Sequence, residues 1–239
     1  MAAALIAWQD KREPIIIMNE LLFIFHTIII SISALIALYL GQAALVAFVC
    51  LQCVLANLFV VKQITLFGFS ATCADAFTIG AVLGLNLLQE YFGRTITRTC
   101  IWINFFLLIF YAIVSQIHIA YVPNAYDTMQ SCFIPILSLM PRIVIASFVV
   151  YFIAQWIDYA LYGFLKRALG DRYLVARNYA SIAFTQLIDT VLFSFFGLYG
   201  IIENVWHVIF ISYAIKLVAI AVASPFVLFS KKIHKQMLK

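Results

Sequence analysis

Long apolar segments recur along this chain, and they constrain its fold more than any other feature. Each is close to the ~20 residues that an α-helix needs to cross a hydrocarbon core of about 30 Å. Hydrophobic residues make up 66% of the sequence and charged residues only 10%, too few charges to cover a soluble globule. We therefore predict an all-α fold, a polytopic transmembrane bundle of six to seven helices. The candidate spans are 21–40, 43–61, 74–92, 100–120, 142–163, 180–202 and 205–229.

The domain organisation is simple. Residues 1–17 are less hydrophobic than the span after them and are treated as an uncertain N-terminal extension, since Met18 is itself a candidate start. Residues 18–239 are expected to form a single transmembrane domain, because no stretch is polar and long enough for a soluble one. A cleaved signal peptide is not expected, since a second apolar span comes directly after the first.

Basic residues in the connecting segments predict the orientation. Lys and Arg are frequent in 93–99, in 164–178 and in the tail after 229, whereas 121–134 and 201–204 have none. By the positive-inside rule, the first three are cytoplasmic, including the C-terminus, and the other two lie outside. We expect a multi-pass membrane protein, in contact with anionic lipid.

The start of the chain is ambiguous on this scheme. Seven spans place the N-terminus outside together with Lys62, although Lys11 and Arg12 favour the inside. The conflict disappears if Met18 is the true start, or if one early span within 62–92 is broken or re-entrant. The stretch 68–93 is the candidate, because it carries Gly68, Gly80, Gly84 and Gly93, and small residues at membrane depth mark close packing or a lined cavity.

Several function classes find no support. The net charge of +5 is spread over segments between apolar spans and does not indicate a nucleic-acid surface. The five cysteines are an odd number and imply no disulfide framework. There is no phosphate loop and no nucleophile motif, and the CxxC of Cys50 and Cys53 has no second pair and no histidine at ligand spacing. We therefore expect no enzyme, no cofactor and no metal site.

A carboxylate and an ammonium lie within the last two spans. Asp189 precedes the short link around Glu203 by about as many residues as Lys216 follows it. Helices joined so tightly run antiparallel, so the two charges should share one depth, roughly 17 Å from the same membrane face at ~1.5 Å per residue. An unpaired charge there costs on the order of 2.5–3.5 kcal/mol, which makes a functional site the first hypothesis. The alternative is a structural ion pair that only holds the bundle together.

Two neighbours of Asp189 extend this candidate site. Gln186 lies one helical turn before it, and Phe193 one turn after it. A carboxylate, an amide and an aromatic ring can hold a planar ligand that forms hydrogen bonds. A guanine-type edge, with two adjacent N–H donors and a carbonyl, fits this set, as do other small heterocycles.

A second polar stripe is predicted in the span 74–92. Asp75, Asn86 and Glu90 are spaced by eleven and four residues and should share one helix face. We expect that face to contact protein and Asn86 to make a buried contact, whereas Asp75 and Glu90 lie near opposite ends and can simply be interfacial. Asn57 indicates an interhelical hydrogen bond.

Several blocks, in order along the chain, resemble the queuosine precursor transporter family, also called the vitamin uptake transporter family. The resemblance implies import of a deazaguanine base, a pre-queuosine base or queuine, across the bacterial inner membrane for tRNA modification. It covers nearly everything after Met18, and the matching polar positions are Asn86, Glu90, Gln186, Asp189 and Lys216. The blocks are ANLFVVKQITLFGF (56–69), ADAFTIGAVLGLNLLQEYFGR (74–94), QWIDYALYGFLKR (155–167), ARNYASIAFTQLIDTVLFSFFGLYG (176–200) and SYAIKLVAIAVASPF (212–226).

The resulting hypothesis is a transporter in which Asp189 accepts the N–H donors of the base and Gln186 or Lys216 donates to its carbonyl. Phe193 or Trp156 would stack on the ring. One alternative is a substrate-binding subunit of an ATP-driven vitamin importer, docked through the small residues Ala43 and Ala47. Another is a non-transporting scaffold. A homo-oligomer is compatible with either, and the sequence does not distinguish which deazaguanine is carried.

Overall fold

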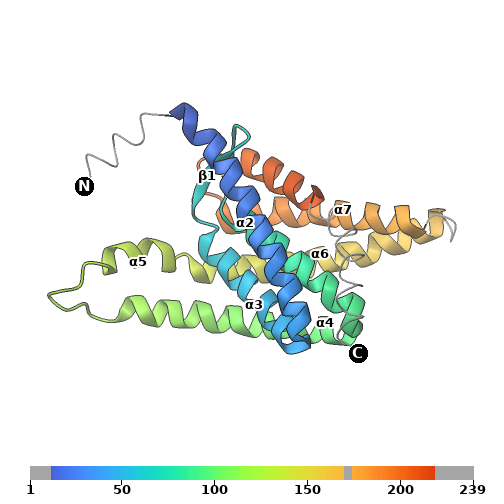
Figure 1. The fold of residues 1–239 in the computed structure, drawn as a ribbon, viewed down its shortest axis with the longest axis horizontal. Coiled ribbons are helices and arrows are strands. Elements are labelled where there is room, and N and C mark those ends of the chain that lie inside the picture. Colours follow the sequence, from blue (N-terminus) through green and yellow to red (C-terminus); the bar gives the residue numbers. More distant parts are fainter. Residues whose placement is uncertain (1–11, 170–173, 219–239) are drawn as a thin grey trace.

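The computed structural model describes residues 12–169 and 174–218 (Figure 1). The tail after 218, with the predicted cytoplasmic C-terminus, lies outside these residues, as does most of the N-terminal extension. The elements, in chain order, are helices α2 (Arg12–Leu40) and α3 (Gln42–Phe59), strands β1 (Gln63–Leu66) and β2 (Phe69–Thr72), helices α4 (Ala74–Ala120), α5 (Gln130–Leu137), α6 (Met140–Leu169) and α7 (Leu174–Phe193), the π-helical turn η2 (Ser194–Leu198) and a final helix (Val205–Val218).

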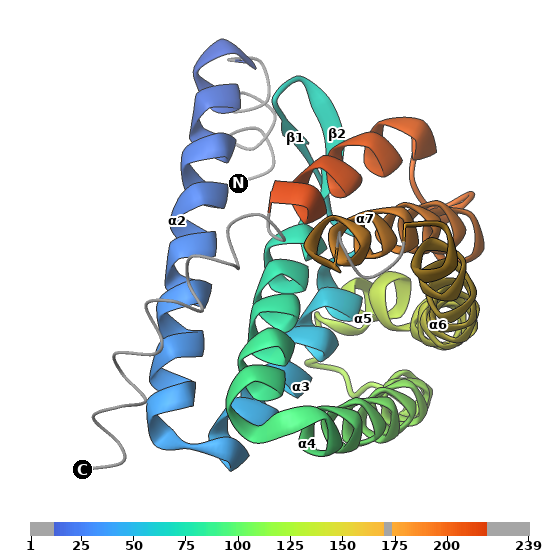
Figure 2. The ribbon, with the colours of Figure 1, turned by 90° about the vertical axis from the view of Figure 1, so that its right-hand side faces the viewer.

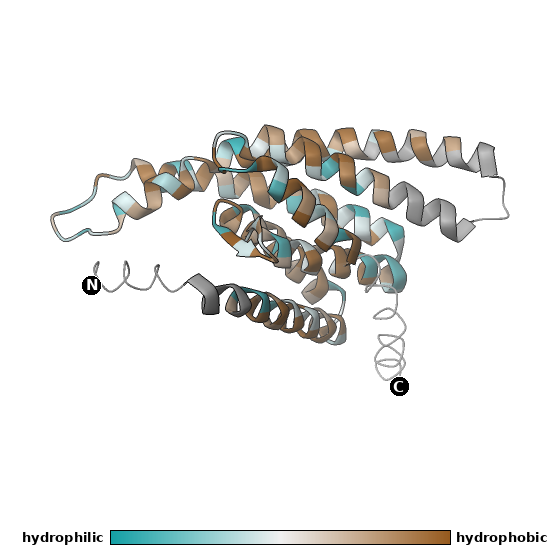
Figure 3. Cartoon of the chain, turned by 90° about the horizontal axis from the view of Figure 1, so that it is seen from above, coloured by the Kyte–Doolittle hydropathy of each residue, from teal (hydrophilic) through white to brown (hydrophobic). Residues whose placement is uncertain are grey.

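The predicted helical bundle is confirmed. Within the described residues, four helices are long and apolar enough to cross a membrane: Met18–Leu40, Gln42–Phe59, Ala74–Ala120 and Gln130–Ala154. Two shorter apolar helices, Ala183–Leu198 and Val205–Val218, come after them in the chain. Hydrophobic side chains dominate along the helices, and the polar residues gather at the connections, such as the loop after α4 (Figure 3).

Helix α4 contains two of the predicted spans. Its 47 residues would measure ~70 Å if straight, more than twice the thickness of a hydrocarbon core. Gly93, with φ 83°, bends it into a first arm before Gly93 and a second arm after it, which run in different directions (Figure 2). The predicted loop over 93–99 is therefore wrong, because one glycine in the left-handed region makes the turn and helix resumes at once. Thr97 supports the restart by donating to the Gly93 carbonyl at 3.1 Å.

A β-hairpin that the sequence analysis did not anticipate occupies residues 63–72. Its strands pair antiparallel, from Gln63 opposite Thr72 to Leu66 opposite Phe69. Phe67 and Gly68 both have positive φ, 51° and 79°, as a two-residue type I′ turn requires. Phe67 is unusual in this conformation, and its backbone N–H is held at 2.8 Å by the carboxylate of Glu20 on α2.

The hairpin packs against the final helix, and both views place them side by side (Figures 1 and 2). Leu66 and Ala71, on its inner face, are fully buried in one cluster with Ile211 and Ile215. Alternate residues of a strand point to opposite faces, so the hairpin can offer an apolar platform from a short segment. The final helix therefore has one apolar face fixed on the hairpin.

Two glycines let the first arm of α4 approach α2 and α3. A Cβ atom built on Gly84 would lie 2.5 Å from Val49 Cγ2, and one on Gly80 would lie 2.5 Å from Ile30 Cγ2. Neither distance is compatible with a real side chain. The predicted close packing of this glycine-containing stretch is thus confirmed at Gly80 and Gly84.

Replacing Gly84 by alanine tests this packing. We expect Gly84→Ala to lower the free energy of unfolding by about 1–3 kcal/mol, because the added methyl group must displace a rigid valine. Val49→Ala makes room on the opposite side, so the double variant should lose less stability than the sum of the two single variants. Thermal unfolding of the purified protein in detergent measures this. Additive losses would contradict the contact.

Candidate functional site

The turn before the final helix determines where that helix points. Arg142 of α6 donates from Nε to the Phe196 carbonyl at 3.1 Å and from Nη2 to the Tyr199 carbonyl at 2.6 Å. These bonds satisfy carbonyls that the end of a helix leaves without partners. Gly200 then reverses the chain with φ 79°, and Asn204 caps the final helix by accepting from the His207 N–H at 3.2 Å.

The final helix brings Lys216 to Asp189. Lys216 Nζ lies 2.7 Å from Asp189 Oδ2 and 3.0 Å from Thr190 Oγ1. The pairing that the spacing about Glu203 predicts is confirmed. The Lys216 side chain is 13% exposed and that of Asp189 is 32% exposed, so the pair is neither sealed in the core nor free on the surface.

The pair faces an open cavity of about 260 Å³ lined by residues of α3, both arms of α4, α6, α7 and the final helix. Asp189, Lys216 and Phe193 form one part of its wall. This volume lies just below the ~300–1,000 Å³ usual for drug-sized ligands and suits a smaller molecule. Polar side chains from other helices complete the lining: Asn57, Thr78, Asn104, Ser147 and Tyr151.

The two asparagines of this cavity differ in their hydrogen bonds. Asn57 donates from Nδ2 to the Cys53 carbonyl at 2.8 Å and accepts from Ser147 Oγ at 3.2 Å, which confirms the predicted interhelical bond between α3 and α6. Asn104 Oδ1 is buried and has no hydrogen-bond partner in the described part of the chain. A buried acceptor without a partner costs about 1–3 kcal/mol, and a ligand N–H in the cavity would remove that cost.

Phe193 owes its place at the cavity to a glycine. A Cβ atom on Gly197 would lie 3.2 and 3.3 Å from two atoms of the Phe193 ring and 3.5 Å from Ala146. The π-helical turn that contains Gly197 thus leaves room for the Phe193 ring, which a side chain at position 197 would crowd. An aromatic face beside a carboxylate and an ammonium is suited to a flat, polar molecule.

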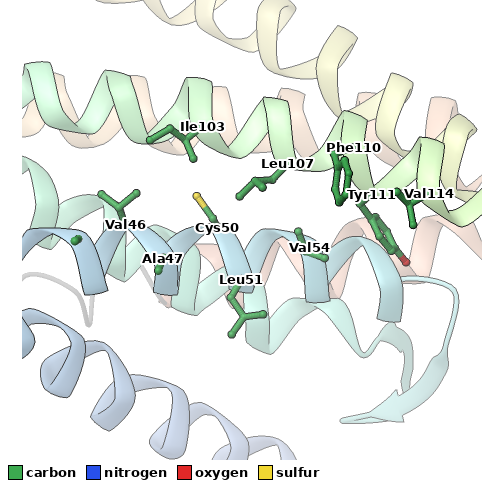
Figure 4. A pocket seen from close by; sticks show the side chains of 11 residues that line it. Val46, Ala47, Cys50, Leu51, Val54, Ile103, Leu107, Phe110, Tyr111 and Val114 are labelled. Carbon is green, nitrogen blue, oxygen red and sulfur yellow. The ribbon is translucent and has the colours of Figure 1, made fainter.

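A larger groove of about 560 Å³ lies between α3 and the second arm of α4 (Figure 4). Its lining is almost entirely aliphatic and aromatic, and it includes Ala43 and Ala47. A polar ligand would lose its hydrogen bonds with water there and gain few in return. The smaller, polar cavity is therefore the candidate site.

Three predicted site residues lie elsewhere. Asn86 and Glu90 are exposed, and Gln186 is half-buried and does not line the cavity. The predicted buried contact of Asn86 is wrong, because the packed face of this arm is the one with Gly84, and a residue two positions on points to the opposite side of a helix. A role of these three residues in binding stays a prediction.

The two rings predicted to stack on the base lie in different places, and stacking itself stays a prediction. Phe193 lines the cavity, whereas Trp156 is 73% exposed and does not reach it. The sequence analysis overlooked Asn104, although an asparagine in the apolar run IWINFFLL is the same kind of signal as Asn57. It also treated Asp75 as a candidate for the membrane interface, whereas Asp75 is buried and accepts a hydrogen bond from Ser212 Oγ at 3.0 Å.

Removing one partner of the ion pair should lower the free energy of unfolding more than removing both charges does. We expect Lys216→Met to lower the free energy of unfolding by about 1–3 kcal/mol, less than for a fully buried pair because Asp189 is partly exposed. The double variant Lys216→Met/Asp189→Asn leaves no stranded charge and should recover part of the loss. Thermal unfolding in detergent compares them. Equal stability of wild type and Lys216→Met would show that the pair contributes nothing to folding.

Comparison with known proteins agrees with the resemblance seen in the sequence. The family model described as "Putative vitamin uptake transporter" matches residues 72–230, more than half of the chain. A protein of Bacillus subtilis (strain 168) named "Probable queuosine precursor transporter" is 31% identical over 220 residues, which cover 90% of this chain and 95% of that protein. No solved structure matches. On the match over residues 72–230 and the likeness along nearly the whole chain, this protein belongs to the vitamin uptake transporter family.

Proposed function

We propose that this protein imports a queuosine precursor, a deazaguanine base, across the bacterial inner membrane. The single observation that carries the proposal is the small polar cavity between membrane helices, with an ion pair and an aromatic ring in its wall. The name of the Bacillus subtilis relative supplies the substrate class. That name is of a transporter and lends no support to the alternative of a subunit of an ATP-driven importer.

The chemistry of the cavity suits such a base. The guanine-type edge has two neighbouring N–H donors, which a carboxylate such as Asp189 can accept side by side. Lys216 has three N–H donors, and its bonds to Asp189 and Thr190 use two of them, so the third can donate to the carbonyl of the base. Phe193 covers the ring, and Asn104 Oδ1 accepts an N–H from the far end of the bicycle.

The arrangement of the helices supports the predicted orientation. The loop 121–129 lies at one end of the molecule, and the C-terminal end of α6 and the start of α7 lie at the opposite end (Figure 1). The first has no Lys or Arg, whereas residues near the second include Lys166, Arg167 and Arg177. We propose that the connection between α6 and α7 is cytoplasmic, together with the C-terminus, and that 121–129 lies outside.

Uptake in a bacterial strain that can neither make nor import queuosine precursors tests the function. We expect the wild-type gene to restore queuosine in tRNA when one of the candidate bases is supplied. Asp189→Asn, expressed at the same level, should not restore it, because an amide has only one acceptor oxygen and cannot neutralise Lys216. Glu203→Gln is the matched control, since this carboxylate is exposed on the turn after α7. No restoration by wild type with any base would refute the proposal.

A second variant separates binding from folding. Asn104→Leu keeps the size of the side chain and removes an acceptor that has no partner among the described residues. We expect weaker uptake, by about 2- to 10-fold in apparent KM, from the loss of one hydrogen bond worth ~0.5–1.5 kcal/mol. Stability should change little, because the variant removes the buried acceptor together with the hydrogen bond between the Asn104 and Cys53 side chains.

Asn57→Leu provides the contrast for this experiment. It removes the hydrogen bond between Asn57 of α3 and Ser147 of α6 and should lower the free energy of unfolding. Initial rates of uptake against base concentration, with thermal unfolding of the same variants, measure both effects. A stable Asn104→Leu with unaltered KM would remove Asn104 from the site.

A further inference from the structure

The buried carboxylate of Asp75 has no role in the candidate site. It lies in the first turn of α4, is only 5% exposed, and does not line the cavity that holds Asp189 and Lys216. Its Oδ2 accepts a hydrogen bond from Ser212 Oγ at 3.0 Å, across 137 residues of sequence. Ionisable groups within membrane helices are costly and mark ion or proton pathways.

The first turns of α4 face three different surroundings. Ala74 and Thr78 line the polar cavity. Ile79, one turn after Asp75, packs with Ile211 and Ile215 of the final helix. A second cavity, of about 310 Å³, touches the remaining face and is lined by His26, Lys62, Cys73, Ala76 and Phe77 among others. Asp75 is therefore placed between two cavities, on the face covered by the final helix.

The final helix connects Asp75 to the candidate site. Ser212 and Lys216 are four residues apart and share one face of this helix. Ser212 donates to Asp75, Lys216 donates to Asp189, and Lys216 is also near enough to Asp75 for a charge interaction. Two carboxylates thus compete for one ammonium. With both ionised, the cluster carries one net negative charge, which one proton would neutralise.

The other groups that face Asp75 add little charge. The backbone of Thr72 on β2 bonds to it, and Cys73 adjoins it. Lys62 interacts with Cys73 and lines the second cavity, where His26 of α2 also lies. Among the described residues, Lys216 is thus the cation that interacts with both carboxylates.

We propose that Asp75 is the proton carrier that couples import to a pH gradient, an inference that rests on the proposed function. One proton binds the Asp75 carboxylate from the outer side and is released from it to the cytoplasm in each cycle, and no other bond forms or breaks. While ionised, Asp75 draws Lys216 and competes with Asp189. Once protonated, it frees Lys216 to pair with Asp189 and the base. The final helix carries the change, because it holds both partners.

Two assays on the purified full-length protein in liposomes test this inference. Exchange measures swapping of labelled base with unlabelled base at equal pH. Accumulation measures uptake of the labelled base against its gradient when the outside is made acidic. We expect wild type to do both. Asp75→Asn, which keeps an acceptor for Ser212 but cannot be deprotonated, should retain exchange and lose accumulation.

Two further variants complete the test. Ser212→Ala keeps the carboxylate, so it should still accumulate base, with its pH profile moved to higher pH because the ionised form has lost a donor. Glu203→Gln, on the exposed turn, should behave as wild type in both assays.

Three results would overturn the inference. They are accumulation by Asp75→Asn at the wild-type level, loss of exchange together with accumulation in a folded Asp75→Asn protein, and wild-type accumulation driven by a sodium gradient rather than by pH. A wild-type protein that exchanges no deazaguanine base would instead refute the proposed function itself, and with it the coupling.

Discussion

The ion pair between Lys216 and Asp189 is the interaction on which the last quarter of the chain depends. Neither charge can be left alone among apolar helices without a cost of several kcal/mol. A short link after the helix of Asp189 must therefore bring the chain back, so that Lys216 reaches the depth of Asp189. Gly200 and the cap at Asn204 make this reversal of the chain possible. Arg142 donates hydrogen bonds to the carbonyls that the end of the preceding helix leaves without partners. The pair is held at the wall of the cavity and not within a sealed core.

The meeting of this pair could be predicted because two local rules determine it. A short link forces neighbouring helices to run antiparallel, and equal spacing from the link then gives equal depth. The stripe of Asp75, Asn86 and Glu90 has no such constraint. Its spacing is right, but burial depends on which partner covers the helix, and the final helix covers only the end with Asp75. Helical periodicity shows which residues share a face but not what that face contacts.

The hairpin and the bend in α4 could not be predicted from the sequence, again because contacts with distant parts of the chain determine them. Residues 63–72 contain no Asn-Gly or Asp-Gly pair that would indicate a hairpin, and the turn needs Phe67 at positive φ. That conformation is stabilised by Glu20, 47 residues earlier in the chain. At Gly93, a glycine followed by Arg94 predicts a loop, whereas the backbone changes direction at one residue and stays helical. Tertiary contacts decide both cases.

The final helix is the element through which these features act together. Its apolar face, with Ile211 and Ile215, is fixed on the hairpin, and its polar face reaches one carboxylate on α4 and another on α7. A shift of this helix cannot change the Asp189 contact without also changing the Asp75 contact, because Ser212 and Lys216 are separated by a single rigid turn. The hairpin therefore does more than connect α3 to α4. It provides the apolar surface along which the final helix would shift. Coupling between a proton and a substrate requires an element that can adopt two arrangements, with both binding sites favouring one of them. The final helix contacts both the Asp75 carboxylate and the Asp189 site.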